Sequence, residues 1–527
     1  MIALQLTYNY GFRWYSESEI SVKGIAIHPD GRVLREKGLS DYFIGIDSSQ
    51  LFAQRLRELN GIFAVVIRRE KELYAAVDRL RNIPLFYGFL KKTLSLSDDY
   101  HAFTSDPSAK LNDDALFYMR SFGYTPDRQT LIDNLFQLQS GEYLHYRDEV
   151  MELTSYCPIA ALPAFPSDKT AAKRAFADIL EQTTERLIRQ INNRPVALPL
   201  SGGMDSRLIG LMLKRGGVKA KDILCFTYGN RNSREVAGSK AIAARLGFPW
   251  QLIDYEQFIG MEYLHTRQFE QYVDFCGNAV SFPYIQEYFA GKQLKEQLHL
   301  PEETLFLPGH SGDMVGGSHL YPDMETFASE GQFATKVVQL RGKQIPLPPR
   351  ERERLISQLA ASVDASLSGY SHRMHDQWNV RERQAKQTVN SAKVWNYFGY
   401  EYLLPLWDYR FAEFFFSLPF SLRVYKRFYE ELLREQFAAN NLLLPHETRS
   451  GVHARQCAYL KIRLKERFPF LEKLKKPDDS MFDFFHFKEL LAPMWHELPA
   501  IPFNEKNALL TEWYIRRVME ELKASNE

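Results

Sequence analysis

The sequence lacks the features that mark several classes of protein. Only four cysteines occur in 527 residues, and no two of them form a CxxC pair. This scarcity excludes a disulfide scaffold and the usual zinc-finger spacing. We expect Cys157, Cys225, Cys276 and Cys457 to be isolated, reduced thiols. The formal net charge is only +1, so no excess charge favours nucleic acid or an acidic membrane surface as a partner.

Long apolar runs are also missing. No stretch reaches the roughly 18 apolar residues of a membrane span, and the richest patch, 411–420, contains Glu413. The first residues, MIALQLTYNYGFRWYSESE, lack the basic start, apolar stretch and cleavage site of a signal peptide. We therefore expect a cytoplasmic protein with no integral membrane segment.

The sequence does contain a large supply of core-forming residues. Aromatic side chains make up 14% of the chain, which is typical of packed cores and not of disorder. Its length predicts about two to four domains. Residues 1–155 have a β-rich pattern, with strands expected at 61–67, 72–78 and 141–147.

A linker and then a change of pattern follow this region. Residues 157–170 contain three prolines and predict an irregular linker. Ser167 or Asp168 is expected to cap a helix over 171–191. From residue 195, strands alternate with helices, which favours a parallel sheet with helices on both faces. We expect strands at 195–200, 222–229, 249–255 and 304–309, helices at 204–216 and 233–247, and mostly helical structure from about 350 to 527.

The loop SGGMDS, residues 201–206, joins the first of these strands to its helix. In a doubly wound sheet, ligands bind beyond the carboxyl ends of the strands. Gly202 and Gly203 allow the backbone to approach a ligand closely, and the N–H groups at the start of the helix favour a phosphate. Ser201 and Ser206 add hydroxyl donors. Asp205 would repel phosphate unless a cation lies between them, which indicates Mg²⁺.

This loop also has a simpler interpretation. Ser, Gly and Asp are common in turns, and a match of six residues can arise by chance. Its position between an apolar strand and a helix favours nucleotide or pyrophosphate binding over a chance turn. The loop is not a Walker A motif, because GxxxxGK[ST] is absent.

Several further segments resemble one protein family. The motif SGGxDS after a strand resembles the PP-loop of ATP pyrophosphatases. LPGHSGDMVGG (307–317), YEYLLPLWDYRFAEFFFSLP (400–419) and LNGIFAVVI…LYAAVDRLRNIPLFYG (59–88) resemble, in the same order, segments of asparagine synthetases. We identify the chain as an asparagine synthetase-like protein.

The resemblance implies a fold in two domains. Residues 1–158 are expected to form a glutaminase-like α/β/β/α sandwich of the Ntn-hydrolase type. Residues 170–527 are expected to form the ATP-binding synthetase domain, a doubly wound parallel sheet with a helical extension.

The resemblance also implies a reaction and the residues that carry it. ATP adenylates a carboxylate and releases pyrophosphate, and a nitrogen nucleophile then displaces AMP to form an amide. Fixed cations and N–H donors are expected to stabilise the charge on the phosphates. Asp313 matches the second acidic metal ligand beside Asp205, and Gly309 matches a glycine that passes the nucleotide. Leu198 and Thr227 are expected to flank the adenosine, although ordinary core packing explains these two equally well.

A late basic residue of the family falls within RVYKRFYEELLREQF (423–437). Both Lys426 and Arg427 are candidates to face the reacting phosphate, with a slight preference for Lys426, and a solvated helix face is the alternative for either. Glu401 aligns with a family glutamate, but the arginine two residues later is Leu403 here. Substrate contacts in that segment are therefore expected to differ.

Other departures concern the nitrogen source and the second loop. Glutamine-using members carry a cysteine directly after the initiator methionine, whereas this chain begins Met-Ile and has no cysteine in its first 150 residues. We expect a glutaminase-like fold without glutamine hydrolysis. His310 stands where the family has glutamate, and Met314 follows Asp313. His310 is a candidate to orient substrate or to take a proton near pH 7, with plain surface polarity as the alternative.

These departures leave several functions open. The favoured one is an ATP- and Mg²⁺-dependent ligase that amidates a uronic acid or another sugar or peptide carboxylate with ammonia or an amine. The alternatives are an asparagine synthetase that uses aspartate and ammonia, a ring-closing enzyme similar to β-lactam synthetases or lasso-peptide cyclases, and a nucleotide-binding scaffold. A homodimer is possible on family grounds. The basic run 460–479 is expected to be a solvated helix face, or else a contact for an anionic or lipid-linked substrate.

Overall fold

The computed structural model describes residues 2–106, 108–342, 344–345, 347–363, 369, 371–444, 447, 460, 464, 485–501 and 505–524. Most of the basic run 460–479, with Lys475 and Lys476, and also Cys457 therefore lie outside the described residues. No helix in the described part of the chain combines the length and the apolarity that a membrane crossing needs.

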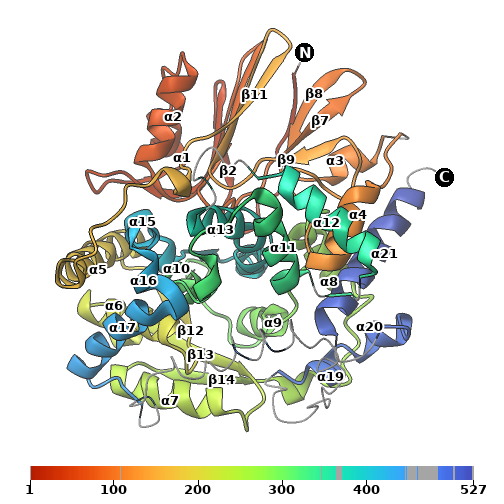
Figure 1. The fold of residues 1–527 in the computed structure, drawn as a ribbon. Coiled ribbons are helices and arrows are strands. Elements are labelled where there is room, and N and C mark those ends of the chain that lie inside the picture. The colour runs from red at the N-terminus through yellow and green to blue at the C-terminus, as the bar shows by residue number, and fades with distance from the viewer. Residues whose placement is uncertain are drawn as a thin grey trace.

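Two β-sheets, with helices outside them, form the N-terminal part of the fold (Figure 1). One sheet has the order β1-β8-β7-β9, and the other the order β11-β10-β6-β5-β3-β2, with β4 beside β3. The strands are β1 (Ile2–Gln5), β2 (Trp14–Glu17), β3 (Ile20–Ile27), β4 (Val33–Arg35), β5 (Asn60–Arg68), β6 (Glu72–Val77), β7 (Phe86–Leu90), β8 (Thr93–Ser97), β9 (Leu135–Gln137), β10 (Glu142–Arg147) and β11 (Val150–Ser155). The helices are α1 (Glu36–Tyr42), α2 (Ser49–Glu58), α3 (His101–Thr104) and α4 (Asp113–Phe122).

This arrangement is the expected α/β/β/α sandwich. In Figure 1, α1 and α2 lie outside the larger sheet, and α3 and α4 lie on the other side, beyond β7 and β8. The three strands predicted for this region match β5, β6 and β10. β5 and β6 are buried over almost their whole length and pair in antiparallel register, for example Val65 with Ala76.

A helix connects the sandwich to the second part of the chain. The linker contains only a short 3₁₀ turn, η1 (Ile159–Ala161), before α5 (Lys169–Ile191) begins. The Asp168 carboxylate accepts hydrogen bonds from the N–H groups of Thr170 and Ala171, so Asp168 is the residue that caps this helix.

A parallel sheet of five strands forms the base of the C-terminal part, in the order β14-β13-β12-β15-β16. Its strands are β12 (Val196–Pro199), β13 (Ile223–Gly229), β14 (Trp250–Asp254), β15 (Leu305–Phe306) and β16 (Glu401–Tyr402). Four of these match predicted strands, and all four pairings are parallel. The sheet is doubly wound. On one face, Leu198 contacts the helix of Gly210, and on the other face Trp395 stacks on Phe306 at 4.3 Å.

The helices of this part surround the sheet (Figure 1). They are α6 (Met204–Arg215), α7 (Arg234–Leu246), α8 (Arg267–Gly277), α9 (Tyr288–Glu296), α10 (Gly312–Val315), α11 (Glu330–Arg341), α12 (Pro349–Ala361), α13 (His372–Asn379), α14 (Lys393–Tyr397), α15 (Tyr409–Ser417), α16 (Phe420–Arg423), α17 (Arg427–Ala439), α19 (Phe487–Leu490), α20 (Ala492–Glu497) and α21 (Lys506–Ala524). The short turns are η2 (Ala220–Asp222), η3 (Tyr255–Phe258), η4 (Pro322–Met324), η7 (Asn390–Ala392), η8 (Pro405–Trp407) and η9 (Val424–Lys426), and η6 (Val380–Thr388) is a π-helix.

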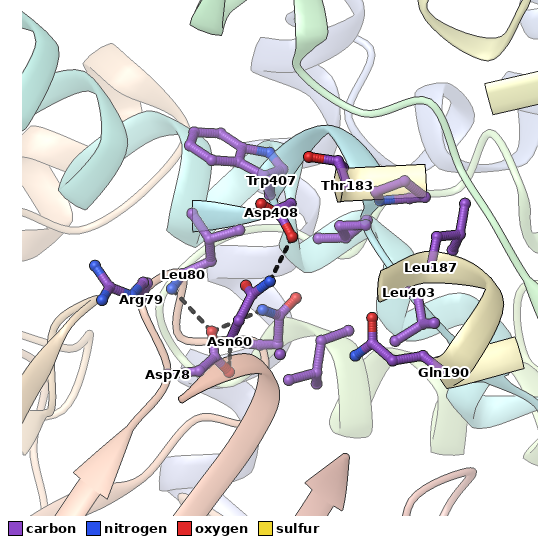
Figure 2. Close-up of a pocket in the computed structure, with 15 residues that line it drawn as sticks. Asn60, Asp78, Arg79, Leu80, Thr183, Leu187, Gln190, Leu403, Trp407 and Asp408 are labelled. Atoms are coloured by element: carbon purple, nitrogen blue, oxygen red, sulfur yellow. Dashed lines mark hydrogen bonds between the residues drawn. The ribbon is translucent and has the colours of Figure 1, made fainter. Parts of the chain in front are cut away.

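A polar seam joins the two parts of the molecule. A cavity of about 40 Å³ lies there. Its lining includes Asn60 and Asp78 from the N-terminal part and Gln190 and Asp408 from the C-terminal part (Figure 2). The Asn60 amide donates to Asp408 at 2.6 Å, and Arg186 also donates to this carboxylate. A cavity of this size has room for a few water molecules at most, so the seam has a structural role.

The segment around Glu401 belongs to this seam. Glu401, at the start of β16, pairs with Arg35 from the sandwich and with Arg194. Leu403 lines the seam cavity. Glu401 therefore lies at the amino end of β16, away from the carboxyl edge where the loop is found. The expectation that substrate contacts in this segment differ from those of the family stays a prediction.

Candidate active site

The SGGMDS loop joins β12 to α6 at the carboxyl edge of the parallel sheet. Ser201 and Ser206 fix its shape, because their hydroxyl groups are 3.1 Å apart and the Ser201 N–H donates to the Ser206 Oγ. The Gly203 N–H donates to the Ser201 Oγ at 3.1 Å. Gly203 also begins α6 without a side-chain cap, so the first turn of a twelve-residue helix offers its N–H groups to an anion.

The loop borders a cavity of about 530 Å³. The predicted residues on its wall are Ser201, Gly203, Asp205, Ser206, Gly309, His310, Asp313 and Lys426. Gly202 lies just behind this wall, where its N–H donates to the Glu235 carboxylate of α7 at 2.7 Å. The fold therefore brings together, from three separate segments, most of the residues proposed from the sequence.

Two aspartates meet at the base of this cavity. The Asp313 N–H donates to Asp205 Oδ2 at 2.8 Å, and the Tyr429 hydroxyl donates to Asp205 Oδ1 at 2.8 Å. Burial and the nearby Asp313 raise the pKa of Asp205 to about 6, whereas Lys426 acts in the opposite direction. Two adjacent carboxylates in a buried place are unfavourable unless a cation neutralises them.

Asp205 and Asp313 suit Mg²⁺ that also binds phosphate and water better than they suit an ion ligated by protein side chains alone. The described residues contain no group of three or more His, Cys, Asp or Glu side chains able to hold an ion. Mg²⁺ usually binds one or two carboxylates together with phosphate oxygens and water. The donor set of Asp205 and Asp313 next to an anion-binding loop matches that requirement.

The structure separates the two basic candidates. Lys426 lies on the cavity wall, and its ammonium is 3.8 Å from the Glu430 carboxylate. Arg427 is exposed, and its guanidinium lies 5.5 Å from the centre of the Tyr425 ring. Tyr425 and Lys426 both have positive φ angles, 60° and 50°, which are strained for non-glycine residues. This strained turn presents Lys426 to the cavity and leaves Arg427 outside.

Gly309 and His310 form the part of the cavity wall beside the SGGMDS loop. A Cβ atom on Gly309 would lie 2.8 Å from the Ser206 backbone nitrogen, so only glycine allows this approach. The His310 Nε2 lies 3.3 Å from the Ser391 Oγ. Burial lowers the pKa of His310 to about 4, so the ring is neutral at pH 7. The geometry favours a hydrogen-bonding role over the expected proton transfer near pH 7.

Leu198 and Thr227 do not reach this cavity. The Leu198 side chain is fully buried in the core beneath the sheet. The Thr227 hydroxyl donates to the Leu200 carbonyl oxygen and lies 2.6 Å from the Ser239 Oγ. The expectation that they flank an adenosine is corrected, because both side chains point into helix-covered faces of the sheet.

The sequence did not indicate the remaining part of the wall, which includes Tyr228, Tyr284, Gln286, Glu287, Arg383, Gln387, Thr388, Trp395 and Asn507. Glu287 is the most unusual of them. Burial raises the pKa of its carboxyl group to about 7, and the Tyr228 hydroxyl donates to its Oε1 at 2.8 Å. Among the described residues, its Oε2 has no hydrogen-bond partner. No motif marks SFPYIQEY (281–288), so only the fold reveals this group.

The fold and the loop define an α/β protein of the PP-loop class. The family model for asparagine synthase matches residues 175–450, and that for a glutamine amidotransferase domain matches residues 49–157. The first match covers more than half of the sequence. The chain belongs to the asparagine synthase family.

Individual relatives are distant. The chain is 22% identical over 361 residues to the microcin J25-processing protein McjC of Escherichia coli, covering 65% of this chain and 61% of that protein. Two solved structures also match, the allosteric regulatory enzyme of purine biosynthesis and the glutamine PRPP amidotransferase from B. subtilis complexed with ADP and GMP. They are 12% and 11% identical to this chain, with TM-scores of 0.18 and 0.17. Each match covers 63% of this chain, and it covers 59% of the first matched chain and 60% of the second. Scores this low carry no argument about the fold.

Proposed function

We propose that this protein is an ATP- and Mg²⁺-dependent ligase that forms an amide bond through an acyl-adenylate. The observation that carries the proposal is the meeting of the SGGMDS loop, the Asp205–Asp313 pair and Lys426 on one cavity of about 530 Å³. A phosphate-binding loop, two acids suited to a divalent ion and one cation are the groups that adenylation of a carboxylate requires. Membership of the asparagine synthase family supports the same reaction.

The residues of the chain have separable parts in this reaction. The N–H groups of the first turn of α6 and the hydroxyl groups of Ser201 and Ser206 are proposed to bind the phosphates. Lys426 is proposed to stabilise the charge that grows on the α-phosphate as the carboxylate attacks. Mg²⁺, when bound by Asp205 and Asp313, neutralises phosphate charge. His310 is proposed to orient the acceptor through a hydrogen bond.

We propose that the nitrogen comes from free ammonia or from a substrate amine. The match to a glutamine amidotransferase domain describes the fold of residues 49–157, and the expected lack of glutamine hydrolysis stays a prediction. The cytoplasm remains the proposed location, because the reaction consumes ATP. The boundaries proposed for the two domains are residues 1–158 and 170–527.

The test is AMP formation by the purified protein. ATP, Mg²⁺ and ammonium are supplied with uronic acids, amino acids or carboxylate peptides, and AMP and pyrophosphate are measured. AMP that appears only with a carboxylate supports the proposal, and Asp205→Asn should abolish it. A folded protein that binds an ATP analogue but forms no AMP under any condition would leave only the nucleotide-binding scaffold. Asparagine formed from aspartate would instead identify an asparagine synthetase.

One finding favours a second candidate, ring closure within a single substrate. The relative from Escherichia coli is named for processing microcin J25. A ring-closing enzyme is also one of the alternative functions that the sequence leaves open. In this case the amine and the carboxylate belong to one molecule. AMP would then form without ammonium, and the product would be lighter than the substrate by one water molecule.

A further inference from the structure

A second cavity adjoins the candidate active site. It has a volume of about 450 Å³ and shares Arg383, Gln387 and Asn507 with the wall of the first cavity. Its far side is formed by Phe122 and Tyr124, from the end of α4 and the residues that follow it in the N-terminal part of the chain. This cavity is therefore built by both parts of the molecule.

Two arginines face this cavity, and neither forms an ion pair within the described residues, although Glu505 also lies on its wall. Arg341, at the end of α11, and Arg383, on the π-helix η6, also share the wall of a third cavity of about 220 Å³ with Asp313. Within the described ranges, neither guanidinium forms an ion pair or a hydrogen bond, and the Arg341 Nε is buried without a partner. Burial and the neighbouring Arg383 lower the pKa of Arg341. Two close, half-buried cations are unfavourable until an anion binds them.

A third unsatisfied donor lies beside the arginines. The Tyr124 Oη is buried and has no hydrogen-bond partner within the described residues. Tyr124, Arg341 and Arg383 line the same cavity. Burial and the nearby Glu382 raise the pKa of this phenol, whereas Arg383 and Arg341 act to lower it. The Phe122 ring, 5.9 Å from that of Tyr124, adds an apolar surface. Unused donors next to an aromatic surface are typical of a ligand site.

The backbone that carries Arg383 is itself unusual. Residues Val380–Thr388 form nine residues of π-helix, a conformation that is rare and occurs most often at functional sites. Three of its side chains, Arg383, Gln387 and Thr388, line the candidate active site. The irregular helix thus connects the nucleotide cavity to the arginine pair.

We propose that Arg341, Arg383 and Tyr124 form the acceptor subsite and bind an anionic group of a carboxylate-bearing substrate. The remainder of that substrate lies on the rings of Phe122 and Tyr124. Planar guanidinium groups can hold a carboxylate through paired hydrogen bonds. The subsite rests on the proposed function, because it supplies the acid that the adenylating cavity consumes.

Binding of defined probes tests this subsite. The full-length protein is saturated with Mg²⁺ and a nonhydrolysable ATP analogue and is titrated calorimetrically with D-glucuronate, L-aspartate and triglycine. Counterparts in which neutral amides replace the carboxylates, namely glucuronamide, asparagine amide and triglycine amide, are titrated in parallel at a pH above the pKa of their amino groups. At least one acid should bind, and its neutral counterpart should bind about tenfold more weakly, a difference of about 1.4 kcal/mol.

Variants identify the groups responsible. Arg341→Gln and Arg383→Gln should each weaken the binding acid by about tenfold or more, and Tyr124→Phe should weaken it less. Arg427→Gln is the matched control, because Arg427 is exposed outside the cavity. Affinity for the ATP analogue should be unchanged in Arg341→Gln, Tyr124→Phe and Arg427→Gln. If a Gln variant does not fold, Arg→Lys at the same position retains the charge and removes the paired geometry, and it should bind the acid more weakly.

Each result separates this proposal from the proposed function. The subsite is refuted if no acid binds the wild-type protein, if the neutral counterparts bind equally well, or if the arginine variants bind like Arg427→Gln. It is also refuted if Arg383→Gln loses the ATP analogue to the same extent, because the guanidinium then belongs to the nucleotide. Acid binding as expected without any AMP would refute the proposed ligase and leave the subsite in place.

Discussion

Replacing Gly309 by alanine tests the close approach between the two loops of the active site. The added Cβ would lie 2.8 Å from the Ser206 backbone nitrogen, 3.1 Å from its Cα and 3.2 Å from its Cβ. These are atoms of the first turn of α6 and cannot rotate away as a flexible side chain does. The loop of residues 307–311 must therefore separate from the SGGMDS loop by several tenths of an ångström.

The size of the effect follows from the cost of overpacking. Inserting a methyl group into a closely packed place typically costs about 1–3 kcal/mol. Because the strain falls on the segments that flank the phosphate site, we expect affinity for Mg²⁺ and a nonhydrolysable ATP analogue to fall by about tenfold or more, with about 1.4 kcal/mol for each factor of ten. Isothermal titration calorimetry measures the affinity, and a thermal melt reports the strain.

A matched glycine provides the control. A Cβ on Gly331, in the first turn of α11, would have only the Ser329 Oγ within 4 Å, at 3.6 Å. Gly331→Ala should leave nucleotide affinity unchanged. If Gly309→Ala binds the analogue as tightly as the wild type and melts at the same temperature, the two loops are not in contact and the site geometry is wrong.

Three further predictions concern separate residues. Lys426→Met should lower the rate of AMP formation by about 10²-fold, whereas Arg427→Met should not change it. Asp376→Asn should lower the free energy of unfolding by about 3–5 kcal/mol, because the buried Arg423 and His319 lose their shared carboxylate. The control Asp114→Asn, at an exposed ion pair, should lower it by less than about 1 kcal/mol. Urea denaturation measures both, and equal losses would contradict this prediction. Burial raises the pKa of Glu287 from 4.5 to about 7, so its contribution to stability is present below pH 4.5 and is lost as pH rises through 7. In Glu287→Gln, the free energy of unfolding should fall by about 3 kcal/mol less than in the wild type between pH 4.5 and 8. If the variant and the wild type show the same dependence of stability on pH, the prediction is wrong.

The sequence predicts the parts of the fold that depend on local pattern. The strands β5, β6, β12, β13 and β14 are four to nine residues long, and turn residues bound them. By contrast, β16 has only the two residues Glu401–Tyr402, and no periodicity can be measured over two residues. The π-helix η6 was also not predicted, since its hydrogen bonding depends on packing and not on composition.

The candidate site divides in a similar way. Ser201, Gly203, Asp205 and Ser206 lie on one short loop whose chemistry is local, so the sequence identifies them. Leu198 and Thr227 were misplaced because nearness to a strand end does not tell which face a side chain occupies. For Lys426, the spacing along the chain was ambiguous, and only the strained turn at Tyr425 decides the direction of the side chain.

The arginine pair has no sequence signature, since its components come from segments more than 40 residues apart. The proposed acceptor subsite nevertheless gives the N-terminal part of the chain a physical role. Phe122 and Tyr124 close the second cavity, and Arg35 and Asn60 attach the sandwich to the synthetase part through Glu401 and Asp408. A rigid wall for the acceptor requires this attachment but no glutamine chemistry. The sandwich would then affect which acid is amidated even where it supplies no ammonia, and changes along the seam should alter affinity for the acceptor before they alter affinity for ATP.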